Sequence, residues 1–126
     1  MARFKDLIVY QKSKDLVIQV YALLKLFPDD ERFALCGQMR RAAISIPSNI
    51  AEGMARVSNK DQSHFLNIAY ASLMELYAQL DIAHDLGYIN QNEYEKIEIS
   101  INEIDKMIIS LSYIRKHTTA SNGNKK

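Results

Sequence analysis

The chain has 126 residues, of which 48% are hydrophobic and 25% charged, and its formal net charge is +1. These values are typical of one soluble globular domain, and so small a net charge does not by itself indicate a nucleic-acid-binding protein. No apolar run approaches about 20 residues and no apolar leader opens the chain, which argues against a transmembrane helix and a signal peptide. A single cysteine, Cys36, excludes an internal disulfide, so we expect a cytoplasmic protein.

The charges are distributed unevenly along the chain. Residues 1–60 hold 10 Lys/Arg and 6 Asp/Glu, whereas residues 61–126 hold 6 and 9. This difference favours a basic face in the first half and an acidic face in the second. Ordinary scatter over the surface explains the same counts, so both interpretations stay open.

The first predicted helix covers about residues 7–26. Asp6 is placed to cap its start, and Pro28 ends it because proline disrupts a continuing helix. The helix has one apolar stripe of residues spaced three or four apart. They are Leu16, Val20, Leu23 and Phe27.

The second predicted helix covers about residues 30–53. Acidic residues at 29–31 suit the positive end of its dipole, and Gly53 is a natural stop. Pro47 lies inside this helix, where it removes one backbone hydrogen bond and is expected to bend the chain. The apolar side consists of Leu35, Met39, Ala42, Ala43, Ile46 and Ile50.

The third and fourth predicted helices, about 59–86 and 91–116, carry apolar seams with heptad spacing, which is typical of near-parallel bundle packing. Ser58 is the expected N-cap of the third helix and Gly87 its end, and residues 90–93 form a capping box for the fourth. The seams are Leu66, Ala69, Leu73, Leu76, Leu80 and Ala83, then Tyr94, Ile97, Ile101, Ile104, Ile108 and Leu111.

Four helices with short connections predict an all-α fold, an antiparallel up-and-down four-helix bundle over residues 1–116 with a proline-kinked second helix. The polar segment 117–126 is predicted to be a disordered tail. Apolar residues also occur off the stripes, in a number that favours a homo-oligomer. They are Ile8, Tyr10, Ile18, Tyr21, Phe65, Ile68, Ile82, Ile99, Ile109 and Tyr113.

The sequence contains few residues in patterns typical of catalysis. The sequence has neither a glycine-rich phosphate loop nor a nucleophile motif, so we expect no catalytic residue, no cofactor and no small-molecule substrate. Asp81 and His84 have the spacing of a carboxylate–histidine metal pair in di-iron bundles, but the second pair that such a site needs is missing. We therefore predict no metal and no enzyme, with a metal-dependent enzyme as a minor alternative.

The segment RRAAISIPSNIAEG, residues 40–53, carries a stripe of mostly small polar side chains away from the predicted core. The stripe consists of Arg41, Ser45, Ser48, Asn49 and Glu52. Serine and asparagine are poor helix formers that hydrogen-bond locally, and their small size lets another backbone approach. Three interpretations stay open: a helix or subunit interface, local repair in which Asn49 satisfies carbonyls freed by Pro47, and a ligand or nucleic-acid contact.

This segment also resembles a known protein family. The motif combines Phe27-Pro28, Glu31, Leu35, Gln38, Arg40-Arg41-Ala42, SIPSNIAEG at 45–53 and Arg56, and continues as FLNIA at 65–69, SLMEL at 72–76 and LGYI at 86–89. It is similar to the motif of the 23S rRNA intervening-sequence protein family, four-helix-bundle proteins sometimes labelled as ribosomal. The resemblance covers about residues 4–115.

The resemblance implies an antiparallel four-helix bundle that assembles as a homopentamer. Some members are encoded within insertions in 23S rRNA genes, whereas many others are encoded elsewhere and have no assigned function. A related bundle, the accessory protein of diversity-generating retroelements, looks like a basic pentameric barrel that binds nucleic acid and a reverse transcriptase. This chain, at +1, is a poorer match for a nucleic-acid barrel.

We therefore predict a non-enzymatic homo-oligomer that acts as an RNA- or nucleoprotein-binding adaptor without membrane contact. The alternative is a protein-interaction scaffold that binds no nucleic acid. The candidate phosphate contacts are Arg40, Arg56 and Lys60, with Lys12 and Lys14 in support, and Tyr10 beside those two lysines is a candidate for base stacking.

The polar motif is assigned a structural role. Pro47 fixes the bend, and Ser45, Ser48 and Asn49 lie at a close helix or subunit contact. Arg41 is expected to form a partly buried ion pair with either Glu52 or Glu75. These structural or interface residues are thus Arg41, Ser45, Pro47, Ser48, Asn49, Glu52 and Glu75.

Overall fold

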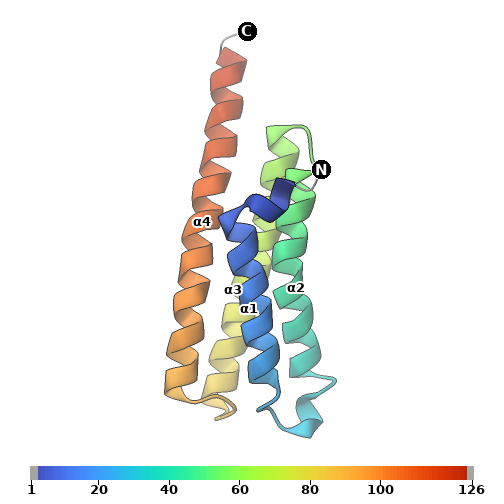
Figure 1. Ribbon diagram of the computed structural model, residues 1–126, viewed down its shortest axis with the longest axis vertical. Coiled ribbons are helices and arrows are strands. Elements are labelled where there is room, and N and C mark those ends of the chain that lie inside the picture. The colour runs from blue at the N-terminus through green and yellow to red at the C-terminus, as the bar shows by residue number, and fades with distance from the viewer. Residues whose placement is uncertain (1–2, 125–126) are drawn as a thin grey trace.

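The computed structural model describes the backbone of residues 3–124 and the side chains of residues 4–117. Four α-helices run alternately up and down in one antiparallel bundle (Figure 1). The elements are η1 (Arg3–Asp6), α1 (Ile8–Leu24), η2 (Asp29–Glu31), α2 (Leu35–Met54), α3 (Asn59–Asp85) and α4 (Gln91–Asn124). No strand occurs within residues 3–124, so the predicted four-helix bundle is confirmed.

The core of the bundle lies along the predicted seams. All six seam residues of α3 are fully buried, and in α4 the four isoleucines of the seam are buried while Tyr94 and Leu111 are partly buried. The helix α2 packs most extensively on α3, and α1 closes the bundle against α4 with the smallest interface of the four neighbouring pairs. The heptad spacing therefore predicted the core because a 3.5-residue period keeps one face toward neighbouring helices.

The predicted ends of α3 and the start of α4 are confirmed. Ser58 Oγ accepts the backbone N–H of Asp61 at 3.1 Å. Gly87 has φ +80°, a left-handed conformation that glycine adopts without strain, and it terminates α3. Asn90 and Glu93 form a reciprocal capping box, with both side-chain-to-backbone hydrogen bonds at 2.8 Å.

The start of α1 differs from the prediction. Residue Leu7, in extended conformation, precedes the helix and makes no side-chain cap, whereas Asp6 lies in the short helix η1. The Phe4 ring packs edge-on against Tyr10 with centroids 4.9 Å apart, which folds η1 back over the beginning of α1. The start of α1 is therefore positioned by apolar packing, and no polar side chain caps it.

The connection before α2 is longer than predicted, because α2 begins at Leu35 and residues 29–31 form the separate turn η2. The Tyr88 hydroxyl donates a hydrogen bond to Glu31 Oε2 at 2.7 Å, and the Tyr88 ring packs on Phe27 with centroids 5.2 Å apart. These contacts tie the connection to the one between α3 and α4. The acidic residues therefore serve the connection and do not occupy the first turn of α2.

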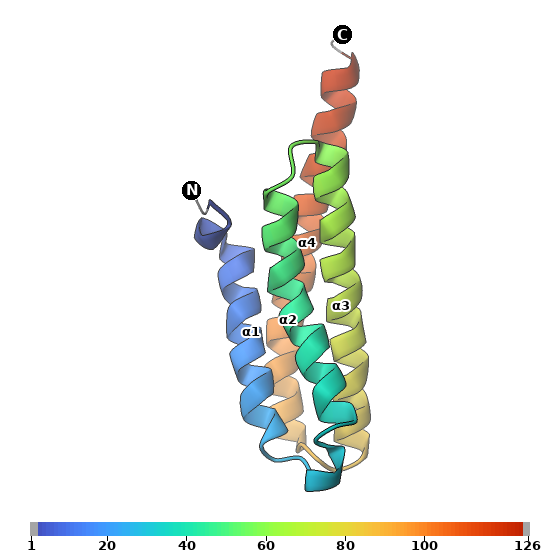
Figure 2. The ribbon, with the colours of Figure 1, turned by 90° about the vertical axis from the view of Figure 1, so that its right-hand side faces the viewer.

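Two predictions about helix ends are corrected. Gly53 does not end α2, which continues through Met54; a Cβ at this glycine would lie 3.1 Å from Phe65 Cβ, so glycine permits close packing on α3. Residues 117–124 extend α4 where a disordered tail was predicted (Figure 2). Extending an existing helix adds one hydrogen bond per ordered residue, whereas starting a new helix is costly in free energy.

Pro47 is buried inside α2, and the bend expected there stays a prediction.

Candidate nucleic-acid interface

The polar stripe of α2 is divided between two neighbours. Ser45 Oγ lies 2.7 Å from Ser72 Oγ of α3, and Asn49 Nδ2 donates to the Ser45 carbonyl at 2.8 Å and to Ser45 Oγ at 2.9 Å. Ser72 is buried, so Ser45 and Asn49 lie at the contact between α2 and α3. Ser48 is exposed and faces the opposite side, toward α1, together with the buried Pro47. Asn49 thus bonds the carbonyl of Ser45 and not that of Ala43, to which Pro47 has no N–H to donate.

The expected ion pair of Arg41 is replaced by another. Glu52 pairs with Arg56, at 3.0 Å between Glu52 Oε2 and Arg56 Nη2, and the Arg56 guanidinium lies 4.6 Å from the centre of the Phe65 ring. Arg41 and Glu75 are both exposed, and Glu75 accepts a hydrogen bond from Gln79 at 3.3 Å. For Glu52 the reason is geometric, since residues 52 and 56 are one turn apart while 41 and 52 are three turns apart.

The five candidate phosphate contacts do not form one patch. Lys12 reaches α4 and pairs with Glu103 at 3.1 Å, while Lys14 lies over the Tyr10 ring on the side of α1 that faces α2. Arg40 lies near the start of α2. Arg56 lies in the connection between α2 and α3 and Lys60 at the start of α3, whereas Arg40 lies fourteen helical residues, about 21 Å along the axis, before the end of α2.

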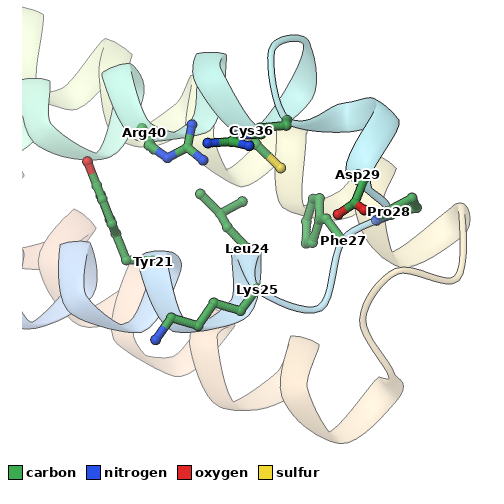
Figure 3. A pocket seen from close by; sticks show the side chains of 9 residues that line it. Tyr21, Leu24, Lys25, Phe27, Pro28, Asp29, Cys36 and Arg40 are labelled. Atoms are coloured by element: carbon green, nitrogen blue, oxygen red, sulfur yellow. The ribbon is translucent and has the colours of Figure 1, made fainter.

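Two hollows follow the junction of α1 and α2, and we call them together the α1–α2 seam. The upper hollow, near η1, has a volume of about 380 Å³ and its wall includes Tyr10, Lys14, Ile18, Ile44, Pro47 and Ser48. The lower hollow, near η2, has a volume of about 360 Å³ (Figure 3). Its wall is formed by Tyr21, Leu24, Lys25, Phe27, Pro28, Asp29, Arg32, Cys36 and Arg40.

The seam is positively charged and carries exposed aromatic surface. Its walls contain four cationic side chains, Lys14, Lys25, Arg32 and Arg40, against the one carboxylate of Asp29. Tyr21 is 39% exposed between them. Cations interleaved with aromatic rings are the usual surface for the phosphates and bases of single-stranded nucleic acid.

The opposite side of the bundle is acidic and holds a cluster of phenols. Tyr94 donates to Asp81 Oδ1 at 3.1 Å, and Tyr77 donates to Glu98 Oε2. Burial, helped by the hydrogen bond to Asp81, raises the pKa of Tyr94, whereas the bond to Glu98 is the main cause that raises the pKa of Tyr77. Both phenols therefore stay protonated at neutral pH and tie α3 to α4.

The Asp81–His84 pair is engaged in this same cluster. The His84 ring stacks on Tyr94 with centroids 4.6 Å apart and planes at 10°, while Asp81 accepts the Tyr94 hydroxyl. Across the described part of the chain, no three His, Cys, Asp or Glu side chains come together in a metal-binding arrangement. Asp81 and His84 therefore both contact Tyr94 of α4.

The motif and its surroundings match a family. The 23S rRNA-intervening sequence proteins match the chain over residues 5–110, which includes α1, η2, α2, α3 and most of α4. The chain belongs to this family. Among curated proteins, none matches the chain.

A solved structure of the family is similar to this protein. It is a crystal structure of a protein with unknown function from the S23 ribosomal protein family of Bacteroides thetaiotaomicron. The TM-score is 0.77 at 29% sequence identity, over 83% of this chain and 98% of that chain. The family of this 23S rRNA-intervening sequence protein takes its name from an rRNA insertion and not from a catalytic activity. No helix of the described residues is long and apolar enough to cross a membrane.

In this 23S rRNA-intervening sequence protein, two of the four cationic residues of the α1–α2 seam were not predicted from the sequence. Lys25 and Arg32 lie at the end of α1 and just after η2, where the predicted helix boundaries placed neither beside Arg40. One signal was present, because Lys14, Tyr21 and Lys25 are spaced seven and four residues apart and so share one face of α1. That spacing alone does not tell which helix the face meets.

Proposed function

We propose that this protein is a non-enzymatic homo-oligomer that acts as an RNA-binding adaptor, with the α1–α2 seam as its RNA surface. The observation that supports the proposal is the composition of the seam, in which four cations and one carboxylate surround exposed tyrosine. The net charge of +1 conceals this surface because acidic residues gather on α3 and α4. Phosphate contacts supply most of non-specific RNA affinity, so local charge matters more than the total.

The shape of the seam favours a single strand over a duplex. Along α1, Lys14, Tyr21 and Lys25 span eleven residues, about 16 Å, which equals roughly five stacked bases. A row of alternating cations and rings on one helix face suits a backbone with unstacked bases, which stack on aromatic side chains. The upper hollow adds apolar surface beside Lys14, where Ile18 is 67% exposed.

The test is titration of a fluorescent single-stranded RNA at 50 and 200 mM salt. We expect the variant Lys14→Glu/Arg40→Glu to bind at least about tenfold more weakly than wild type, and its affinity to fall less steeply with salt, because two phosphate contacts are lost. The matched control is Lys12→Glu/Arg56→Glu, which changes the charge equally at two cations already paired with Glu103 and Glu52. We expect this control to bind much more tightly than the seam variant.

Two results would contradict the proposal. Equal losses in both variants would mean that affinity follows net charge and not the seam. An oligomer that binds no RNA at 50 mM salt would favour the alternative, a protein-interaction scaffold. The observation behind that alternative is the apolar wall of the upper hollow, where Ile18 and Ile44 are exposed.

Self-association is part of the proposal. Several large apolar side chains of α3 and α4 are exposed away from the seam, among them Ile82, Ile99 and Ile109. A second copy that covers them leaves the seam open to RNA. We expect sedimentation equilibrium at micromolar concentration to give a multiple of the 14.4 kDa chain mass, fivefold if the pentamer implied by the family resemblance forms. A species of single-chain mass at these concentrations would contradict self-association.

A further inference from the structure

The lower hollow of the seam combines three cationic side chains from three parts of the chain. Lys25 follows α1, Arg32 follows η2 and Arg40 belongs to α2, so the connection between the two helices brings them to one wall. Figure 3 shows Tyr21 reaching from α1 toward Arg40 on α2, with Leu24 lying between Tyr21 and Phe27. A hollow of about 360 Å³ is within the usual size of small-ligand sites.

These cations form no ion pair with the described part of the protein, although the Arg32 guanidinium lies 5.3 Å from the centre of the neighbouring Phe33 ring. Among the described side chains, the ion pairs are Lys12–Glu103 and Arg56–Glu52, and none of the three cations of the lower hollow takes part in one. Asp29, the one carboxylate of the wall, lies in Figure 3 at the opposite end of the pocket from Tyr21. The neighbouring Glu31 is held by the Tyr88 hydroxyl at 2.7 Å. The Arg40 end of the hollow is therefore electropositive.

The rest of the wall is apolar and adds no negative charge. Leu24, Phe27 and Cys36 are buried beneath the cations, and Tyr21 offers a partly exposed ring at the side. Burial raises the pKa of the Cys36 thiol more than the nearby Arg40 lowers it, so the sulfur stays protonated. A ligand that fits this hollow has an anionic group for the cations and a flat apolar body for the ring.

We infer that the lower hollow binds the terminal phosphate of a nucleotide, with Lys25, Arg32 and Arg40 on the phosphate and Tyr21 on the base. A phosphomonoester carries a charge near −2 at neutral pH and three acceptor oxygens, whereas a phosphate within an RNA strand carries −1. Planar guanidinium groups bind such oxygens in pairs. This site rests on the proposed function, because Arg40 belongs to the proposed RNA surface as well as to the phosphate site. A terminal phosphate is then the group that the lower end of the α1–α2 seam recognises.

The first experiment is calorimetric titration of the assembled protein with adenosine 5′-monophosphate and, separately, with adenosine. We expect the monophosphate to bind at least about tenfold more tightly, and Lys25→Gln and Arg40→Gln each to weaken it by about tenfold. Lys106→Gln is the matched control, because it removes one exposed positive charge from α4, far from the hollow. Equal affinity for both ligands, or an equal loss in the Lys106→Gln control, would overturn the inference.

A second experiment separates the source of the phosphate from the proposed function. Two RNA strands of one sequence, with a 5′-phosphate and with a 5′-hydroxyl, are titrated at 50 mM salt. If the phosphorylated strand binds more tightly than the hydroxyl strand, and Lys25→Gln abolishes that difference, the ligand is the phosphorylated end of an RNA. If both strands bind equally while adenosine 5′-monophosphate still binds, the ligand is a free nucleotide. Equal binding of both strands without monophosphate binding overturns the inference and leaves the RNA adaptor standing. Monophosphate binding without binding of either strand overturns the adaptor and supports the hollow.

Discussion

Replacing Leu73 with alanine is expected to lower the free energy of unfolding by about 3 kcal/mol. Leu73 is fully buried in the middle of the α3 seam, and α3 packs on both α2 and α4. A side chain that is enclosed by helices on two sides leaves a cavity that the backbone cannot readily close, so the loss includes a cavity term beside the lost burial. Denaturation with urea, followed by circular dichroism, measures the change.

The control for this prediction is Ile99→Ala on α4. Ile99 has a side chain of similar size but is 64% exposed, so its removal takes little apolar surface out of the core. We expect a loss below about 1 kcal/mol in the unfolding of a single subunit. A loss at Leu73 as small as the one expected for Ile99 would contradict the prediction that the seam of α3 is the centre of the core. The comparison also reports on assembly, because a smaller oligomer in Ile99→Ala with unchanged subunit stability would place Ile99 at a subunit contact.

The sequence predicted best those features that depend on near neighbours in the chain. The seam of α3, from Leu66 to Ala83, follows from a period that only a helix in a bundle explains. The caps at Ser58 and at Asn90 are interactions over three residues, so the residue types suffice to predict them. The core seam of α3 and the two caps were therefore predictable.

Features that depend on distant contacts were not predictable in the same way. The turn η2 is held by Tyr88, 57 residues from Glu31, and no local pattern announces that hydrogen bond. The same limit affected the candidate site. Lys12 and Lys14 are close in sequence, but they point to α4 and α2 respectively because two residues turn a helix by about 200°. Which lysine stays unpaired thus depends on Glu103, on another helix.

The second large effect on stability is expected in the polar motif of α2. We expect Asn49→Asp to lower the free energy of unfolding by about 3 kcal/mol at pH 7. The Asn49 amide donates to two oxygen atoms of Ser45, and a carboxylate at this place faces both without a proton to donate. Ser45 in turn contacts Ser72, so the repulsion acts at the contact between α2 and α3. The matched control is Ser48→Asp, which adds the same charge one residue earlier at an exposed position and is expected to cost less than about 1 kcal/mol.

The dependence on pH makes this prediction specific to the hydrogen bonds. In the folded Asn49→Asp variant the Ser45 carbonyl oxygen, which can only accept, favours the protonated carboxyl, which donates as the amide does, so the pKa of this carboxyl is raised above the ordinary value near 4. The unfolded chain then loses its proton first as pH rises, and folding stability falls between about pH 4 and the raised pKa. We therefore expect urea denaturation to show the variant approaching wild-type stability at about pH 4, whereas Ser48→Asp lacks this trend. A cost at Asn49 that is independent of pH would mean that its amide does not hold Ser45, and that the SIPSN motif stabilises α2 by other means.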